Sequence, residues 1–139
     1  MGLIGRIFGG SGVEVEEQPD DRYAILLNAG PDEPGAAANA FQYAIDLDDA
    51  NIEVELWLDG LATKWPMEFN EKPNHPLADY WPQLQNRGLI AGACGCCACA
   101  FDAKQSCELS NVEIKGGDEE HAPNTGELAA GNYEILTVG

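Results

Sequence analysis

Residues 23–29 read YAILLNA, an apolar run of the kind found in strands that are covered on both faces. The loop 30–35, GPDEPG, follows this run. The next segment, 36–50, repeats apolar residues at the three- and four-residue spacing of a buried helix face. This order of strand, loop and helix predicts an α/β fold with a parallel sheet.

The rest of the chain continues the alternation of strands and helices. Further strands are expected over 52–58, 89–93, 112–114 and 133–138, and helical segments over 61–67, 77–87, 100–106 and 126–130. We therefore expect a three-layer α/β/α domain over residues 22–139, with a parallel sheet of about five strands and flavodoxin-like layering. Residues 1–21 are expected to form a flexible acidic N-terminal tail.

Three single residues carry further expectations about the fold. Trp65 and Trp81 are predicted to lie in the core or at a subunit interface. Pro82 is expected to weaken or kink the helix over 77–87. His75, between an asparagine and a proline, is predicted to be an exposed loop residue.

The chain is strongly acidic, with 24 Asp and Glu residues against seven Lys and Arg residues and a net charge of −17. Phosphate groups would be repelled by this charge, which argues against nucleic acid and against an anionic membrane as partners. Screening by salt removes much of the self-repulsion of such a surface. We expect a halophilic adaptation to a salt-rich cytosol, with a basic partner protein as the alternative.

A cytoplasmic location is expected from two features of the sequence. Its apolar runs stay shorter than the roughly 18 residues that a membrane span needs. Residues 1–8, MGLIGRIF, lack the apolar core and cleavage site of a signal peptide. In a reducing compartment, five cysteines are expected to be reactive or metal-binding rather than paired in structural disulfides.

Residues 88–100 read GLIAGACGCCACA, so the strand expected over 89–93 ends in four of the five cysteines. Ligands and chemistry in α/β sheets concentrate at the carboxyl ends of strands. A cysteine beside the N-terminus of a helix has a lowered pKa. If a helix begins around Ala98, residues 94–97 lie at its N-terminus, and activation rests on backbone dipoles because the nearest basic residues, Arg87 and Lys104, stand outside the cluster.

The cysteines form two overlapping CxxC motifs, which favour redox or metal chemistry. Zinc or another soft metal would require the loop to wrap around it, with Cys94, Cys96, Cys97 and Cys99 as ligands. Cys107 or His121 would complete such a site if folded close. Taken singly, Cys96, Cys99 and Cys107 are each expected to be small buried apolar residues.

The chain resembles the DsrE/DsrF-like sulfur-relay family over roughly residues 23–139. The resemblance rests on the first strand with its acidic loop, on the element order, and on a cysteine after the third strand. Many relatives carry CGxC and then, a few residues on, Arg-Gly. Here Cys94-Gly95-Cys96-Cys97 matches the first part, and Ala100-Phe101-Asp102 stands where Arg-Gly would fall.

The resemblance implies a DsrEFH-like subunit that assembles into a homotrimer or homohexamer. For this sulfur-relay interpretation we expect no cofactor. The resemblance also implies that Cys94 accepts sulfur as a persulfide from a donor protein and passes it to an acceptor protein. Cys97 matches the second motif cysteine, which would resolve the persulfide by forming a disulfide. The first hypothesis is thus a sulfur carrier of the sulfurtransferase type. The alternatives are a metal-binding module and a subunit whose thiols sense redox state.

Overall fold

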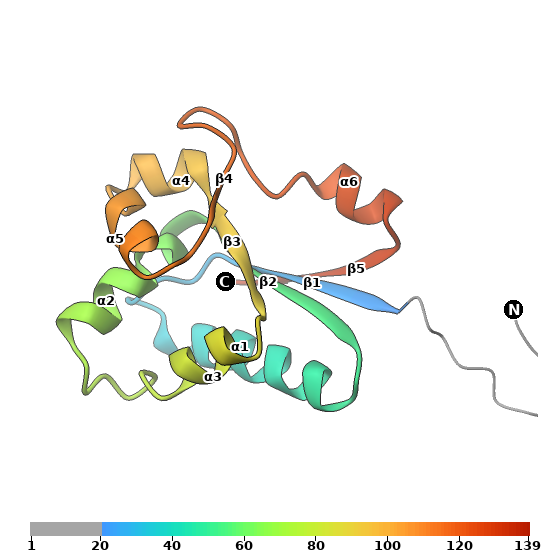
Figure 1. Ribbon diagram of the computed structural model, residues 1–139, viewed down its shortest axis with the longest axis horizontal. Coiled ribbons are helices and arrows are strands. Elements are labelled where there is room, and N and C mark those ends of the chain that lie inside the picture. Colours follow the sequence, from blue (N-terminus) through green and yellow to red (C-terminus); the bar gives the residue numbers. More distant parts are fainter. Residues whose placement is uncertain (1–20) are drawn as a thin grey trace, which may run out of the picture.

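The computed structural model describes residues 21–139 (Figure 1). Its sheet has five parallel strands in the order β4-β3-β2-β1-β5. The strands are β1 (Arg22–Leu27), β2 (Glu53–Leu58), β3 (Ile90–Cys94), β4 (Ile114–Lys115) and β5 (Tyr133–Val138). This is the predicted three-layer α/β/α fold. The expected tail, 1–21, lies outside the described residues apart from Asp21.

Strand β1 is an inner strand, which explains its continuous apolar run. It pairs with β2 from Arg22 opposite Glu53 to Leu27 opposite Leu58, and with β5 on its other side. Side chains alternate between the two faces of the sheet. Ile25 and Leu27 therefore pack into the larger core, while alternate residues of β1 pack into a smaller cluster on the opposite face.

Helices cover the two faces unequally. Figure 1 shows α1 (Pro34–Asp49) and α3 (Tyr80–Asn86) on one side of the sheet and α6 (Thr125–Ala130) on the other. Helix α1 buries the expected stripe, formed by Ala37, Ala40, Phe41, Ala44 and Ile45. The larger core lies between this stripe and the sheet. The smaller cluster, on the α6 side, contains Ala24, Leu26, Trp57 and Ala122.

The remaining helical segments gather at the carboxyl ends of the strands. They are the 3₁₀ turn η2 (Gly60–Lys64) and the helices α2 (Trp65–Glu71), α4 (Gly95–Ala100) and α5 (Lys104–Leu109). Figure 1 shows α2, α4 and α5 together on this side of the molecule. Trp65 is fully buried there, and its indole Nε1 donates a hydrogen bond of 2.8 Å to the carbonyl oxygen of Ala29. Trp65 and Trp81 both belong to the core, as predicted.

Two expectations about loop and helix residues are wrong. His75 is not exposed: its side chain is 11% exposed, and its ring packs edge-on against Trp65 and Phe69. The aromatic residues of α2 create this pocket, which local sequence does not reveal. Pro82 does not disturb its helix, because α3 begins at Tyr80 and the proline falls in the first turn, where the backbone N–H has no intrahelical partner.

The helix after the cysteine strand also differs from the prediction. Helix α4 begins at Gly95, three residues before Ala98, and the chain turns at Asp102 (φ 57°) before α5 begins. The expected helix over 100–106 is therefore wrong. The left-handed conformation of Asp102 stops one helix, and a second starts in a new direction. Strand β3 thus runs directly into α4, with Cys94 at the junction.

Candidate functional site

Asp59 and Cys94 are brought together by the pairing of two neighbouring strands. Asp59 directly follows β2, Cys94 is the last residue of β3, and these strands run parallel. Both side chains therefore lie at the carboxyl edge of the sheet, and both residues are buried. Asp59 is held in place by its own turn, because its Oδ1 accepts a hydrogen bond of 2.9 Å from the backbone N–H of Gly60.

The sulfur of Cys94 is surrounded by hydrogen-bond donors. Cys94 caps the N-terminus of α4, and its Sγ accepts from the backbone N–H of Cys97 at 3.4 Å. The backbone N–H of Ala122 points at the same sulfur, also at 3.4 Å. Two backbone N–H groups are therefore fixed at this sulfur.

His121 lies between Cys94 and Asp59. Its Nδ1 is 3.4 Å from the Sγ of Cys94, and its Nε2 is 3.4 Å from Oδ2 of Asp59. If Nε2 carries the proton and donates it to the carboxylate, Nδ1 is free to accept the proton of the thiol. The distance to sulfur is an ordinary one for a hydrogen bond, whereas the distance between the imidazole and the carboxylate is at the long end of hydrogen-bond reach. The three side chains have the arrangement of a thiol, a neighbouring base and a carboxylate that orients the base.

Cys97 lies one helical turn beyond Cys94, and its thiol contacts the same carboxylate that faces His121. Its Sγ donates to Oδ1 of Asp59 over 3.2 Å. Burial first, and then the hydrogen bond to Asp59, raise the pKa of the Cys97 thiol to about 12. Cys97 is therefore a thiol at neutral pH. The two motif cysteines lie together but have different surroundings.

The other three cysteines lie away from this cluster. The expectation that each of them is a buried apolar residue has a different outcome for each. Cys107 is fully buried in the larger core, as expected, and burial raises its pKa to about 11. Cys96 is half-buried and Cys99 is exposed, so that expectation is wrong for Cys99. Helix α4 turns their side chains away from Asp59, since residues two positions apart point in nearly opposite directions.

A scan against protein-family models matches residues 21–121 to the DsrE/DsrF-like family. The chain belongs to this family. A search of curated proteins finds no match. Among solved structures, the chain is similar to a conserved protein of unknown function from Bacteroides thetaiotaomicron, with a TM-score of 0.61 and 15% sequence identity. The match covers 86% of this chain and 96% of that chain, and it supports the fold alone.

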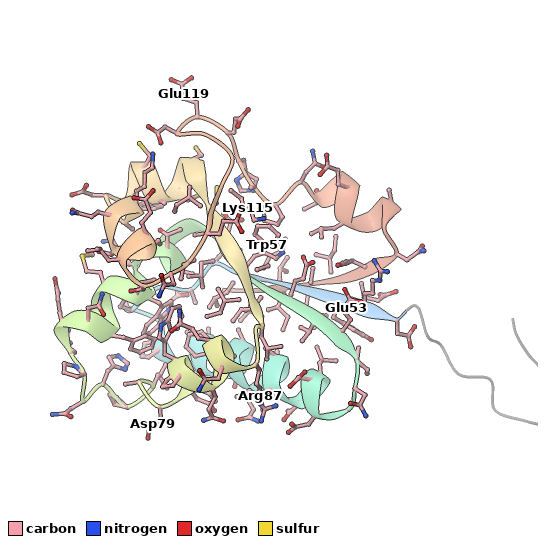
Figure 2. All side chains as sticks on the ribbon, viewed as in Figure 1. Glu53, Trp57, Asp79, Arg87, Lys115 and Glu119 are labelled. Carbon is pink, nitrogen blue, oxygen red and sulfur yellow. The ribbon has the colours of Figure 1, made fainter. Side chains whose placement is uncertain are left out.

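In this DsrE/DsrF-like protein, a cavity of about 710 Å³ opens beside His121. His121 and Ala122 form part of its wall, together with Trp57, Lys115 and Tyr133. Figure 2 shows Trp57 and Lys115 between the cysteine strand β3 and helix α6. Cys94 itself is 0% exposed, whereas the His121 side chain is 57% exposed. A ligand in the cavity therefore meets the imidazole before the sulfur.

Sequence reasoning found the two cysteines of the site but not how they are supported. Cys94 and Cys97 were predicted from the motif, and the structure brings their sulfurs together with Asp59 and His121. The sequence indicates His121 only as a further metal ligand and predicts no role for Asp59. The one signal for Asp59 was its place after β2, next to the cysteine strand.

None of the helices described over residues 21–139 has the length and the apolar character that a membrane span requires.

Proposed function

We propose that the protein carries sulfur as a persulfide on Cys94, with His121 as its acid–base partner. The observation that carries the proposal is the set of contacts at one sulfur. The Sγ of Cys94 faces an imidazole nitrogen at 3.4 Å and two backbone N–H groups. A plain core cysteine does not need such partners, whereas a thiol that alternates between thiol, thiolate and persulfide does.

In the loading step, His121 accepts the proton of Cys94, and the thiolate attacks the outer sulfur of a donor persulfide. The bond between the two donor sulfurs breaks, and the donor thiolate leaves with the proton held by His121. Cys94 then carries an added sulfur, and the donor is a simple thiol. In the delivery step, an acceptor thiolate attacks this outer sulfur and Cys94 departs as a thiolate. The N–H groups of Cys97 and Ala122 stabilise that leaving group.

Asp59 is a positioning residue in this scheme. Its Oδ2 faces the Nε2 of His121 at 3.4 Å, which directs the other nitrogen toward Cys94. Cys97 has the resolving role that the family resemblance implies. Its thiolate would attack the inner sulfur of the persulfide, form a disulfide with Cys94 and release the outer sulfur as sulfide. Because Cys97 is protonated at neutral pH, this branch is expected to be slow.

The proposal includes the partners and setting expected from the sequence. Sulfur is received from one protein and given to another, in a cytosol, by a homotrimer or homohexamer. Membership of the DsrE/DsrF-like family supports a sulfur-relay role in general terms. The burial of Cys94 fits a carrier, because a persulfide inside the protein is protected from water and oxidants.

The test is sulfur loading followed by mass spectrometry of the intact protein. Reduced, chelator-treated protein is incubated with cysteine persulfide, and a gain of one sulfur atom is expected on the peptide that contains Cys94. The variant Cys94→Ser should lose this gain. The matched control Cys99→Ser, altered on the exposed side of the same helix, should load like the wild type. A Cys94→Ser protein that still gains one sulfur in full yield contradicts the proposal.

A further inference from the structure

Four side chains from three separate segments present metal-binding atoms to one another at the end of the sheet. They are Asp59, Cys94, Cys97 and His121, and one ligand atom from each lies within 4.8 Å of the others. We propose that these four residues form a binding site for a zinc ion. The site differs from one formed by the four cysteines of residues 94–99, because only two of those cysteines belong to it.

The chemistry of the four ligand atoms matches zinc. Zinc in proteins takes four ligands from cysteine sulfur, histidine nitrogen and carboxylate oxygen, in a tetrahedral arrangement. A set of two thiolates, one imidazole and one carboxylate suits a borderline-soft ion such as Zn²⁺. It suits Cu⁺ less well, because Cu⁺ favours sulfur alone, and Mg²⁺ less well, because Mg²⁺ favours oxygen.

Two of the six distances between the four ligand atoms are already close to those of a tetrahedral site, and the others lie within 4.8 Å. With metal–ligand bonds of about 2.0–2.3 Å, neighbouring ligand atoms are about 3.3–3.8 Å apart. Here the Sγ of Cys94 is 3.4 Å from Nδ1 of His121, and the Sγ of Cys97 is 3.2 Å from Oδ1 of Asp59. The hydrogen bonds that link these pairs would be replaced by bonds to the ion. Small shifts of the more distant pairs complete the tetrahedron.

The ligands also differ in mobility in a way that fits metal entry. Asp59 and Cys94 are buried, and Asp59 is fixed by its bond to the N–H of Gly60. Cys97 is half-buried, and His121 lies in the loop that follows β4, with a side chain that is 57% exposed. An ion would therefore enter beside the imidazole, which then closes the site. Cys96 and Cys99 point to other sides of α4 and cannot reach the same ion.

Zinc binding has a consequence for sulfur transfer, and this part of the inference rests on the proposed function. An ion bound to the Sγ atoms of Cys94 and Cys97 requires both as thiolates. Binding therefore releases two protons to solvent. One comes from Cys97, and the other comes from Cys94 or from His121, whichever of the two holds it in the metal-free protein. The Cys94 sulfur is then occupied by the metal and cannot attack a donor persulfide. Bound zinc and a loaded persulfide are thus expected to exclude each other.

The experiment uses the full chain, reduced and freed of metal, in high salt with excess Mg²⁺ so that weak binding to acidic surface groups is suppressed. Zinc is titrated by calorimetry in two buffers of different protonation enthalpy, and cobalt(II) serves as a spectroscopic probe of thiolate ligation. We expect one ion per chain, submicromolar affinity, release of two protons and the visible bands of tetrahedral cobalt with sulfur ligands.

Matched variants separate this site from one formed by the four cysteines of residues 94–99. Asp59→Asn keeps the oxygen that caps Gly60, and His121→Asn alters an exposed side chain, so both variants should fold, as a thermal melt would verify. Each should weaken zinc binding at least about 100-fold, since even residues behind the ligands cost about 10–100-fold when changed. Cys96→Ser and Cys99→Ser should bind zinc like the wild type.

Three results would overturn parts of this inference separately. Wild-type protein that binds no stoichiometric zinc removes the site. Binding that survives Asp59→Asn and His121→Asn but fails in Cys96→Ser or Cys99→Ser assigns the metal to the four cysteines of residues 94–99 instead. Zinc-loaded protein that still gains sulfur at the metal-free rate removes the exclusion but leaves the site. Failure of sulfur loading in metal-free protein would contradict only the proposed function, because the titration does not depend on it.

Discussion

Two CxxC pairs share the short segment formed by the end of β3 and by α4, and they have opposite surroundings. Cys94 and Cys97 face Asp59 and His121 at the end of the sheet. Cys96 is half-buried and Cys99 is exposed. A helix advances by about 100° per residue, so positions three apart share a side and positions two apart do not. Of the two overlapping motifs, one therefore places its cysteines in the candidate site and the other places them outside it.

The largest effect on the difference between the two pairs is expected from removal of the imidazole, which only the first pair contacts. His121→Asn should lower the rate of sulfur loading about 100-fold, because a positioned general base contributes about 100-fold or more. The loading rate at several pH values, followed by mass spectrometry, checks this expectation. Raising the pH should partly restore the variant, because hydroxide then deprotonates Cys94 without help.

The outer pair provides the control for this prediction. Cys99→Ser leaves every contact of Cys94 in place and should load at the wild-type rate. A His121→Asn protein that loads as fast as Cys99→Ser at neutral pH would show that the imidazole has no part in the reaction. The difference between the two pairs would then rest on burial and on the backbone N–H groups at the Cys94 sulfur.

Most of the sheet could be predicted from local sequence, because buried strands record their surroundings directly. The run 23–29 is apolar because β1 pairs on both edges and is covered on both faces. Helix α1 repeats apolar residues at helical spacing because one side packs on the sheet. Helix α4 has no such pattern: its residues are glycine, cysteine and alanine, so its first residue could not be located from hydrophobicity.

Half of the candidate site could not be found in the same way, because it depends on contacts between distant segments. His121 is 27 residues from Cys94, and Asp59 is 38 residues from Cys97. His121 reaches the sulfur only because β4 brings its loop beside β3, and that strand has two residues. Asp59-Gly60 looks like an ordinary turn. Only the order of the strands places it next to Cys94.

A smaller effect is expected from Gly95, where α4 packs against the segment that leads to His121. A Cβ atom at this position would lie 2.6 Å from the carbonyl oxygen of Gly117 and 2.7 Å from that of Gly116. Backbone atoms cannot move aside as a flexible side chain does. Gly95→Ala should therefore push the His121 loop away, lower the free energy of unfolding by about 1–3 kcal/mol, and slow sulfur loading. Chemical denaturation and the loading assay measure the two effects.

Gly35 in α1 is the matched control, because a Cβ there meets nothing within 4 Å. Gly35→Ala should leave loading unchanged and raise the free energy of unfolding by up to about 1 kcal/mol through helix propensity. If Gly95→Ala is as stable and as active as Gly35→Ala, α4 and the His121 loop are not packed as closely as described. The difference between the two cysteine pairs would then not depend on close packing between α4 and the His121 loop.

The smallest effect concerns the pKa of Cys97, which distinguishes the two cysteines within the first pair. Burial is the largest cause of its rise to about 12, and the hydrogen bond to Asp59 comes second. Asp59→Asn removes the negative charge but not the burial, so the pKa of Cys97 should fall while staying above that of a free thiol. Alkylating reagents attack the thiolate. In metal-free protein at pH 8, Cys97 of the Asp59→Asn variant should therefore be alkylated several-fold faster than Cys97 of the wild type. Cys99, on the other side of α4, should react at the same rate in both proteins. An unchanged rate at Cys97 would mean that burial alone holds its proton, and that Asp59 serves His121 rather than both motif cysteines.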